Sequence, residues 1–199
     1  MGAQISREQF EGVPLRAHEI LAGIPLHDAW VVDLPKTCDG VTLDRFLSVA
    51  DDSAFKPSPV VRLLLRLRFF VGGLLGWDRE QSNATSNTFA TRLTPGDRAR
   101  SRVMPGTQKG PFRVVYRFEN EEVSEIVNST VHGAMLNALV ETPTAYRYYL
   151  GVYVQPVSRL TPLYMAMIDP VRRFIVYPSL LRSVRTNWDR LNDGRHELR

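Results

Sequence analysis

Four consecutive segments between residues 112 and 157 alternate apolar with polar side chains, and this alternation constrains the fold more than any other feature of the chain. A period of two residues is typical of a β-strand with one buried face. The segments read FRVVYRF, EEVSEIVN, VHGAMLNALVE and AYRYYLGVYVQPV, and the Glu119-Asn120 corner after the first favours a hairpin turn. The sequence therefore predicts a meander of antiparallel strands.

The alternation also predicts which side chains share a face of this sheet. In the third segment the face that begins at His132 is apolar and the opposite face is mixed, so we interpret the His132 face as the interior one. Glu121, Glu122 and Glu125 are interpreted as a solvated hairpin edge. The other two predicted apolar faces are Phe112, Val114, Tyr116 and Phe118 in the first segment and Tyr146, Tyr148, Leu150, Val152 and Val154 in the fourth.

A short strand and two helices are predicted before the meander. AWVVDLP predicts a strand that ends at Pro35. TLDRFLSVA predicts a short helix that begins near Thr42. Pro57 and Pro59 break that helix, and the pattern predicts a second helix over residues 60 to about 71.

The tail of the chain returns to helical spacing, with prolines that must start or kink helical segments. One strand, two helices, an antiparallel meander and a long final helix is the order of the helix-grip architecture, an α+β fold in which a curved sheet wraps the last helix around a cavity. We expect one such domain over residues 13–191, with an extension at 1–12 and a polar tail at 192–199. The apolar positions of the predicted helix are Leu163, Met167, Val171, Phe174 and Leu181, and its prolines are Pro162, Pro170 and Pro178.

The stretch VVRLLLRLRFFVGGLLGW, residues 60–77, comes nearest to a membrane span. A spanning helix needs about 20 mostly apolar residues, and each Arg near its centre costs about 2.5–3.5 kcal/mol to insert. Arg62, Arg66 and Arg68 therefore favour a core helix instead. Helical geometry turns Arg68 toward the core, where its guanidinium needs a carboxylate, a carbonyl or an anionic ligand. The alternatives are that the helix ends near this residue or that the side chain reaches water.

Composition and charge narrow the class of protein. The chain has 199 residues, 44% hydrophobic content and a single cysteine, Cys38, which has no disulfide partner. Its start lacks the pattern of a secretory signal, so we expect a cytoplasmic protein, although Gly2 and Ser6 match a myristoylation pattern. The net charge of +4 arises mainly from arginine spread along the chain, which indicates a GC-rich bacterial genome rather than a nucleic-acid partner.

The sequence lacks the common motifs of enzyme and cofactor sites. His18, His27, His132 and His196 show no i, i+4 pairing with clustered carboxylates, so no metal site is predicted. The chain contains no P-loop, no G-x-G-x-x-G and no nucleophile elbow, and therefore no cofactor is predicted.

Three stretches of the chain resemble a known family. GLLGWDR, the FRVVYRF meander and LTPLYMAMIDPVRRFIVYPSLL look like the bacterial domain of unknown function 2867, which belongs with the START-like, birch-pollen-allergen-like (SRPBCC) superfamily. The resemblance covers about residues 13 to 190 and implies a helix-grip fold. Leu163, Tyr164 and Pro170 fit the family's tail, whereas Val171 and Arg172 stand where the family has Phe and His. The family has no established activity to transfer.

The expected function is binding of a small hydrophobic or amphipathic molecule in a cavity between the sheet and the C-terminal helix. The polar end of this ligand would meet Arg68 or His132. One alternative is a cyclase- or aromatase-like enzyme that uses His132 or a cavity tyrosine for acid/base chemistry. Another is a non-catalytic interaction domain that exposes residues 60–77 to a partner or a membrane surface. The predicted cavity residues are Arg68, Phe69, Trp77, Tyr116, His132, Tyr146, Tyr148 and Tyr164.

Overall fold

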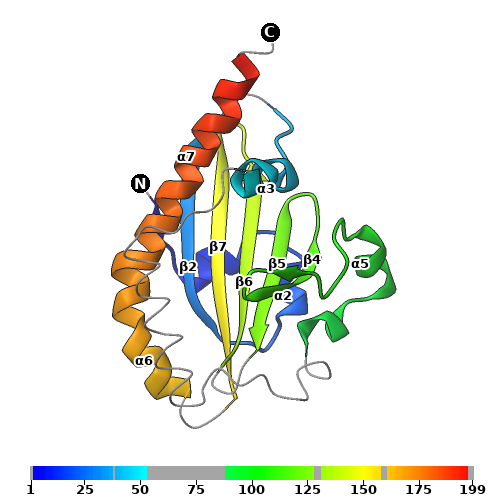
Figure 1. Ribbon diagram of the computed structural model, residues 1–199, viewed down its shortest axis with the longest axis vertical. Helices are drawn as coiled ribbons and strands as arrows, with labels where there is room; N and C mark the ends of the chain where they lie inside the picture. The colour runs from blue at the N-terminus through cyan, green and yellow to red at the C-terminus, as the bar shows by residue number, and fades with distance from the viewer. Residues whose placement is uncertain (1, 38, 53–87, 128–130, 158–160, 197–199) are drawn as a thin grey trace.

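A computed structural model describes residues 2–37, 39–52, 88–127, 131–157 and 161–196. Its centre is a curved antiparallel sheet of seven strands in the order β1-β2-β7-β6-β5-β4-β3 (Figure 1). The strands β4 to β7 are neighbours in chain order, and β2 pairs with β7 from the other side. The strands are β1 Ala3–Gln4, β2 Leu26–Pro35, β3 Gln108–Lys109, β4 Phe112–Arg117, β5 Glu121–Val127, β6 Val131–Glu141 and β7 Ala145–Pro156.

Helices cover both faces of this sheet. The long C-terminal helix and α3 lie in front of it in Figure 1, and α2 lies behind it. The C-terminal helix consists of α6, a π-helical turn η2 and α7. The helices are α1 Arg7–Glu11, α2 Ala17–Ile20, α3 Leu43–Asp52, the 3-10 turn η1 Phe89–Arg92, α5 Pro95–Arg100, α6 Thr161–Val171, η2 Arg172–Val176 and α7 Tyr177–His196.

The strand register creates two separate apolar cores, one on each face. Leu136 lies opposite Val123 and Gly151, so these side chains share the face covered by the N-terminal helices, which we call the N-terminal face. Leu139 lies opposite Tyr148 on the other face, which packs against α7 and which we call the C-terminal face. The C-terminal core includes Val32, Leu34, Phe46, Leu150, Tyr177, Leu181, Val184, Trp188 and Leu191.

A glycine in β7 allows α1 to approach the N-terminal face. A Cβ atom on Gly151 would lie 2.5 Å from the Cζ of Phe10, much closer than atoms can pack. Phe10 is fully buried and its ring also contacts Tyr149 and Tyr153. The chain between residues 7 and 20 is thereby held against the sheet, where it forms one wall of the pocket described below.

The predicted meander is confirmed, but two assignments of side chains to faces are wrong. A β-bulge between Val114 and Tyr116 interrupts the pairing of β4 with β5, so that Val114 lies opposite Ser124 and Tyr116 opposite Val123. Since Ser124 and Val123 are adjacent in a strand, Val114 and Tyr116 point to opposite faces. The sequence pattern contains no signal for this extra residue.

The predicted solvated edge of glutamates is also wrong. Glu121, Glu122 and Glu125 are only 2%, 1% and 3% exposed. They lie in β5, which pairs with a strand on each side and whose first five residues are all buried. The prediction that the His132 face of the sheet is the interior one is therefore incomplete, because each face of the sheet packs against an apolar core.

The C-terminal helix is confirmed, and its buried stripe differs from the predicted one. Leu181 is buried as expected, but Phe174 is 79% exposed. The π-helical turn η2 follows directly after Pro170 and Val171 and adds a residue to one turn, which rotates the phase of the helix. Beyond it, the residues that face the sheet are Tyr177, Leu181, Val184, Trp188 and Leu191.

The strand that ends at Pro35 and the helix from Thr42 are confirmed as β2 and α3, whereas α1, α2, η1 and α5 were not predicted. The predicted helix over 60–71 lies outside the described residues. No helix among the described residues is long and apolar enough to cross a membrane.

Candidate functional site

A pocket of about 510 Å³ opens on the N-terminal face, between the segment that joins α1 to α2 and the turn that joins β4 to β5. We call it the Glu121 pocket, because Glu121 is the most buried of its lining residues. The complete lining is Glu11, Val13, Pro14, Leu15, Arg16, His18, Glu19, Arg100, Asn120 and Glu121.

The carboxyl group of Glu121 is incompletely satisfied. Its Oε1 accepts a hydrogen bond from the Tyr116 hydroxyl at 3.2 Å, and its Oε2 has no partner among the described residues. Burial raises the pKa of Glu121, and the nearby backbone N–H groups of Ala17 and Arg16, the Tyr116 hydroxyl and the Arg100 charge oppose this rise only in part. Burial, followed by the nearby Glu121 charge, raises the pKa of Tyr116 as well. A buried carboxyl group with a raised pKa beside a pocket is a feature of functional sites.

His18, another residue of the pocket lining, also has a buried atom without a partner among the described residues. Its Nδ1 lies 3.3 Å from the Tyr153 hydroxyl, and its ring meets Phe10 edge-on with the centroids 5.3 Å apart. Its buried Nε2 has no partner among the residues that the structure describes. His18 and Glu121 are 103 positions apart (121 − 18) in the sequence, and folding places both in the lining of one pocket.

An ion pair fixes the wall of the pocket relative to α5. The Nε and Nη2 atoms of Arg16 donate to the two carboxylate oxygens of Asp97 at 3.1 and 3.0 Å. The Thr94 side chain caps α5 and also donates to Asp97. The Arg16 hydrogen bonds, with those from Thr94, lower the pKa of Asp97 to about 2 although burial opposes this shift. Asp97 is therefore ionised at neutral pH and holds Arg16 in place.

A second buried polar group on the same face joins β5 to β6. The Oε2 of Glu125 lies 2.9 Å from the Nε2 of His132 and accepts the backbone N–H of Phe89 at 2.9 Å, and the Thr88 hydroxyl donates to Oε1. The Phe89 ring stacks on His132 with the centroids 3.8 Å apart. Burial alone would raise the pKa of Glu125, but these hydrogen bonds lower it. His132 is 1% exposed and its Nδ1 has no partner among the described residues.

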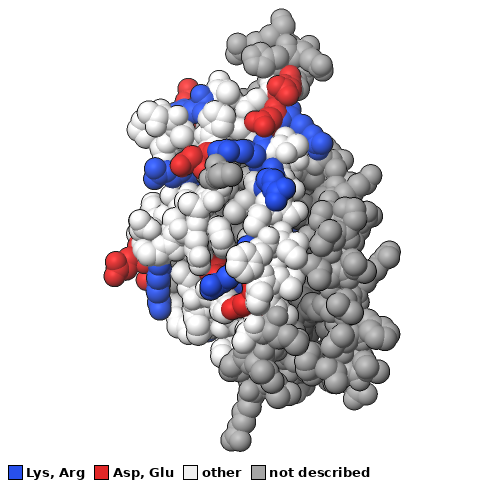
Figure 2. Space-filling view, turned by 90° about the vertical axis from the view of Figure 1, so that its left-hand side faces the viewer, with Lys and Arg blue, Asp and Glu red and all other residues white. Residues whose placement is uncertain are grey.

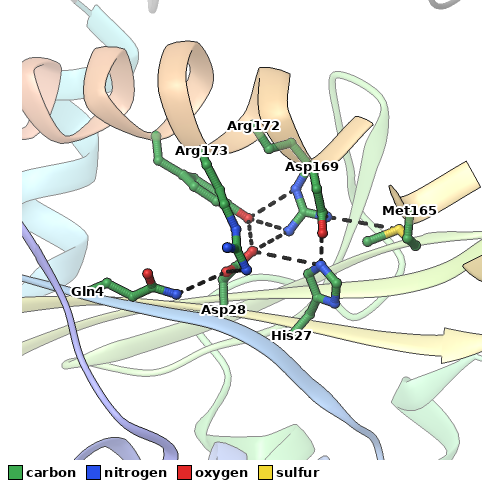
Figure 3. Close-up of polar contacts among 8 residues, drawn as sticks. Gln4, His27, Asp28, Met165, Asp169, Arg172 and Arg173 are labelled. Atoms are coloured by element: carbon green, nitrogen blue, oxygen red, sulfur yellow. Dashed lines mark hydrogen bonds and ion pairs between the residues drawn. The ribbon is translucent and has the colours of Figure 1, made fainter. Parts of the chain in front are cut away.

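The third polar group lies on the C-terminal face, where β2 meets the π-helical turn (Figure 3). The buried carboxylate of Asp28 accepts hydrogen bonds from Arg172 at 2.6 Å, from the Tyr177 hydroxyl at 2.9 Å and from Gln4 at 3.3 Å. Arg173 adds an ion pair at 3.7 Å. Asp28 is thus saturated with donors and ties the helix to the sheet.

Two more side chains extend this group toward α6. The Nε2 of His27 lies 2.9 Å from Asp169, which also forms an ion pair with Arg172 at 3.3 Å. Arg172 therefore bridges the Asp28 and Asp169 carboxylates (Figure 3). No three His, Cys, Asp or Glu side chains within the described residues are grouped so that they could hold a metal ion.

The predicted cavity residues do not form one site. Tyr116 and His132 lie on the N-terminal face, whereas Tyr146 and Tyr148 lie on the opposite face. Arg68, Phe69 and Trp77 and the side chain of Tyr164 lie outside the described part of the chain.

Tyr146 and Tyr148 are parts of the C-terminal core. The Tyr146 hydroxyl donates to Glu141 at 2.9 Å, and the Tyr148 hydroxyl donates to Asn137 at 2.6 Å. The Tyr146 ring packs against Trp188 of α7. Of the predicted cavity residues that the structure describes, Tyr116 is the one in contact with a pocket side chain, Glu121.

Two residues of the pocket, Glu121 and His18, were not predicted as site residues. A signal for Glu121 was present, because Glu121, Val123 and Glu125 share one face of a strand with an apolar side chain between the acids. His18 carried no comparable signal. Its position depends on the short helix α2, which the sequence pattern did not reveal.

Charges on the surface of the described residues are mixed in sign. On the side of the molecule drawn in Figure 2, Lys and Arg side chains lie interspersed with Asp and Glu rather than gathered in one patch. The ion pair of Arg147 with Asp33 is an exposed example. Pairs of this kind contribute little to stability.

Comparison with known proteins gives one match. The chain matches no curated protein and no solved structure. A family model described as protein of unknown function (DUF2867) matches residues 20–179, which is most of the chain and includes Glu121, His132 and Asp28. The protein therefore belongs to the DUF2867 family.

Proposed function

We propose that this protein binds a small amphipathic molecule in the Glu121 pocket. The observation that carries the proposal is that two buried atoms without partners in the described part of the chain, Oε2 of Glu121 and Nε2 of His18, belong to side chains that line the same pocket. Val13, Pro14 and Leu15 supply an apolar wall. The ligand would place its polar end at Glu121 and His18 and its apolar part along this wall.

Energetics and size support this assignment. A buried polar atom without a hydrogen bond costs about 1–3 kcal/mol, so a ligand that supplies a partner recovers free energy that the empty protein lacks. Small-molecule pockets commonly measure about 300–1,000 Å³. The Glu121 pocket, at about 510 Å³, lies within this range.

This proposal moves the site from the face on which the sequence predicted it. On the C-terminal face, the described residues of α3 and α7 pack directly on the sheet, and the buried Asp28 carboxylate has its donors within the protein. On the N-terminal face, by contrast, the Oε2 atom of Glu121 has no hydrogen-bond partner among the described residues. A ligand can therefore supply a missing hydrogen bond to Glu121, whereas the Asp28 carboxylate already has its donors.

Native mass spectrometry of the purified protein tests the proposal. Mild ionisation is expected to show a retained small molecule, which is released under denaturing conditions and then identified. Glu121→Gln preserves shape but removes the carboxylate, and we expect it to weaken binding of that molecule about tenfold or more. Glu119→Gln is the matched control, because Glu119 lies in the same turn but is 67% exposed. Retention of one ligand by wild type and both variants alike would reject the proposal.

Acid/base catalysis in the same pocket is a second candidate. It is favoured by the raised pKa of Glu121, its contact with Tyr116 and the nearby His18. A catalyst converts its ligand, so the wild-type protein would retain product and Glu121→Gln would retain substrate. The two released compounds would then differ in mass, whereas a pure binding protein would release the same compound from both.

A further inference from the structure

We infer that the ligand of the Glu121 pocket is a small zwitterion that carries an apolar side chain, with its amino group at Glu121 and its anionic group at Arg100. The inference rests on the proposed function and names the chemistry of the ligand. It follows from which charged side chains of the pocket have partners within the protein and which do not.

Three of the charged side chains that line the pocket are already paired. Glu11 forms an ion pair with Arg7 at 2.7 Å. Arg16 forms ion pairs with Glu19 and, at 3.0 Å, with Asp97. These charges are balanced within the protein and need no counter-charge from a ligand.

Glu121 and Arg100 remain, and no direct ion pair joins them, although the Arg100 charge is close enough to lower the pKa of Glu121 in part. The guanidinium carbon of Arg100 lies 4.5 Å from the centroid of the Phe118 ring, and no ion pair joins Arg100 to a carboxylate among the described residues. One oxygen of Glu121 accepts the Tyr116 hydroxyl and the other is unpartnered within the described chain. Arg100 is exposed whereas Glu121 is 2% exposed. The pocket therefore has a buried negative group and an exposed positive group.

A ligand ammonium group matches the needs of Glu121. An ammonium ion donates up to three hydrogen bonds and stabilises the charged form of a carboxylate. The raised pKa of Glu121 is in line with this, because it reflects a carboxylate that the protein itself stabilises too little. An anionic group on the same ligand would pair with the Arg100 guanidinium, which binds carboxylates in a bidentate manner.

The remaining walls suit an apolar substituent of modest size. Val13 and Leu15 are buried and Pro14 lies between them in the lining. A volume of about 510 Å³ is ample for an amino acid. An α-amino acid with an aliphatic or aromatic side chain fits this set of groups.

The experiment uses isothermal titration of the full-length protein with three matched probes. These are L-leucine, L-leucinamide, which lacks the anionic group, and N-acetyl-L-leucine, which lacks the ammonium group; the corresponding phenylalanine compounds form a parallel set. We expect the free amino acid of at least one set to bind, and loss of either charged group to weaken its binding about tenfold or more.

Two variants assign each ionic contact to a residue. Glu121→Gln is expected to remove the preference for the free amino group but keep the preference for the free carboxylate. Arg100→Gln is expected to have the reverse effect. Arg190→Gln, at an exposed position of α7, is the control and should behave as wild type.

The results distinguish failure of the zwitterion inference from failure of the proposed binding function. If the amino acids do not bind at millimolar concentration, or if the acetylated or the amidated probe binds as tightly as the free amino acid, the zwitterion inference is overturned. The binding proposal survives that result if Glu121→Gln still loses the molecule found by native mass spectrometry. If Glu121→Gln has no effect on that molecule either, both fail.

Discussion

At the scale of single residues, the buried acidic side chains differ in how completely the protein satisfies them. Asp28 and Asp97 each accept several charged or neutral donors, and both join segments that are distant in the sequence. Glu121 has weaker support and keeps one oxygen without a partner in the described chain. Because an uncompensated carboxyl group costs stability, its presence beside a pocket favours a binding role over a structural one.

Asp97 gives a prediction about the pH dependence of stability. Its folded-state pKa, about 2, is lower than its ordinary value of 3.8, so its ionised form stabilises the folded state. This contribution is fully present above about pH 4 and is lost as the pH falls toward 2. Since Asp97 also serves in the cap of α5, Asp97→Asn should cost about 1 kcal/mol at pH 7.

Urea unfolding of wild type and Asp97→Asn between pH 2 and pH 7 measures this effect. The difference in free energy of unfolding should be constant above pH 4 and should shrink below it. Asp189→Asn is the control, because Asp189 is exposed on α7. A difference that does not change with pH would contradict the assignment of the lowered pKa to Asp97.

At the scale of elements, the π-helical turn determines how the C-terminal helix meets the sheet. It places Arg172 and Tyr177 on Asp28 and, beyond it, brings Trp188 and Leu181 onto the C-terminal core. Phe174, within the turn, is exposed. The turn therefore changes which side of the helix faces the sheet, so that apolar residues before and after it both pack on the sheet.

The role of Asp28 is testable by substitution. Asp28→Asn removes one of the two carboxylates that compensate Arg172, whose side chain is only 14% exposed. Loss of one partner of a buried ion pair costs about 3–5 kcal/mol. Asp33→Asn, on the opposite face of β2, breaks an exposed pair and should cost less than about 1 kcal/mol.

Chemical denaturation gives both values. If the Asp28 group serves to fasten the helix, Asp28→Asn should also increase hydrogen exchange in η2 and the start of α7. Equal stability of the Asp28 and Asp33 variants would show that the helix is held by apolar packing alone.

At the scale of the whole molecule, helices cover both faces of one sheet, and the two cores are separated by the strands themselves (Figure 1). The central strands β6 and β7 contribute residues to both cores and pair on both sides. The edge strands β1 and β3 consist of two residues each. Stability should therefore be highest at the centre of the sheet.

Hydrogen exchange followed by mass spectrometry tests this gradient. Amides of β6 and β7 are expected to exchange most slowly, at the rate set by global unfolding, and those of β1 and β3 much faster. Exchange of β7 as fast as β1 would contradict the predicted gradient of stability from the centre of the sheet to its edges.

The sequence by itself determined the elements whose signal is local. The four strands of the meander and the turn at Glu119 follow from a period of two residues and from turn composition, which neighbouring residues create together. The long C-terminal helix follows from its own periodicity. The short helices α1 and α2 were missed because helices of this length depend on packing, such as Phe10 against Gly151, more than on propensity.

Only the tertiary structure decided which faces are buried and where the pocket lies. A β-bulge places Val114 and Tyr116 on opposite faces, and tertiary packing buries Glu121, Glu122 and Glu125 of β5. The pocket joins His18 to Glu121 and Arg100, three residues far apart in the chain. Their proximity results from packing between elements, and no pattern of adjacent residues encodes it, because local periodicity specifies the direction of a side chain but not what lies opposite.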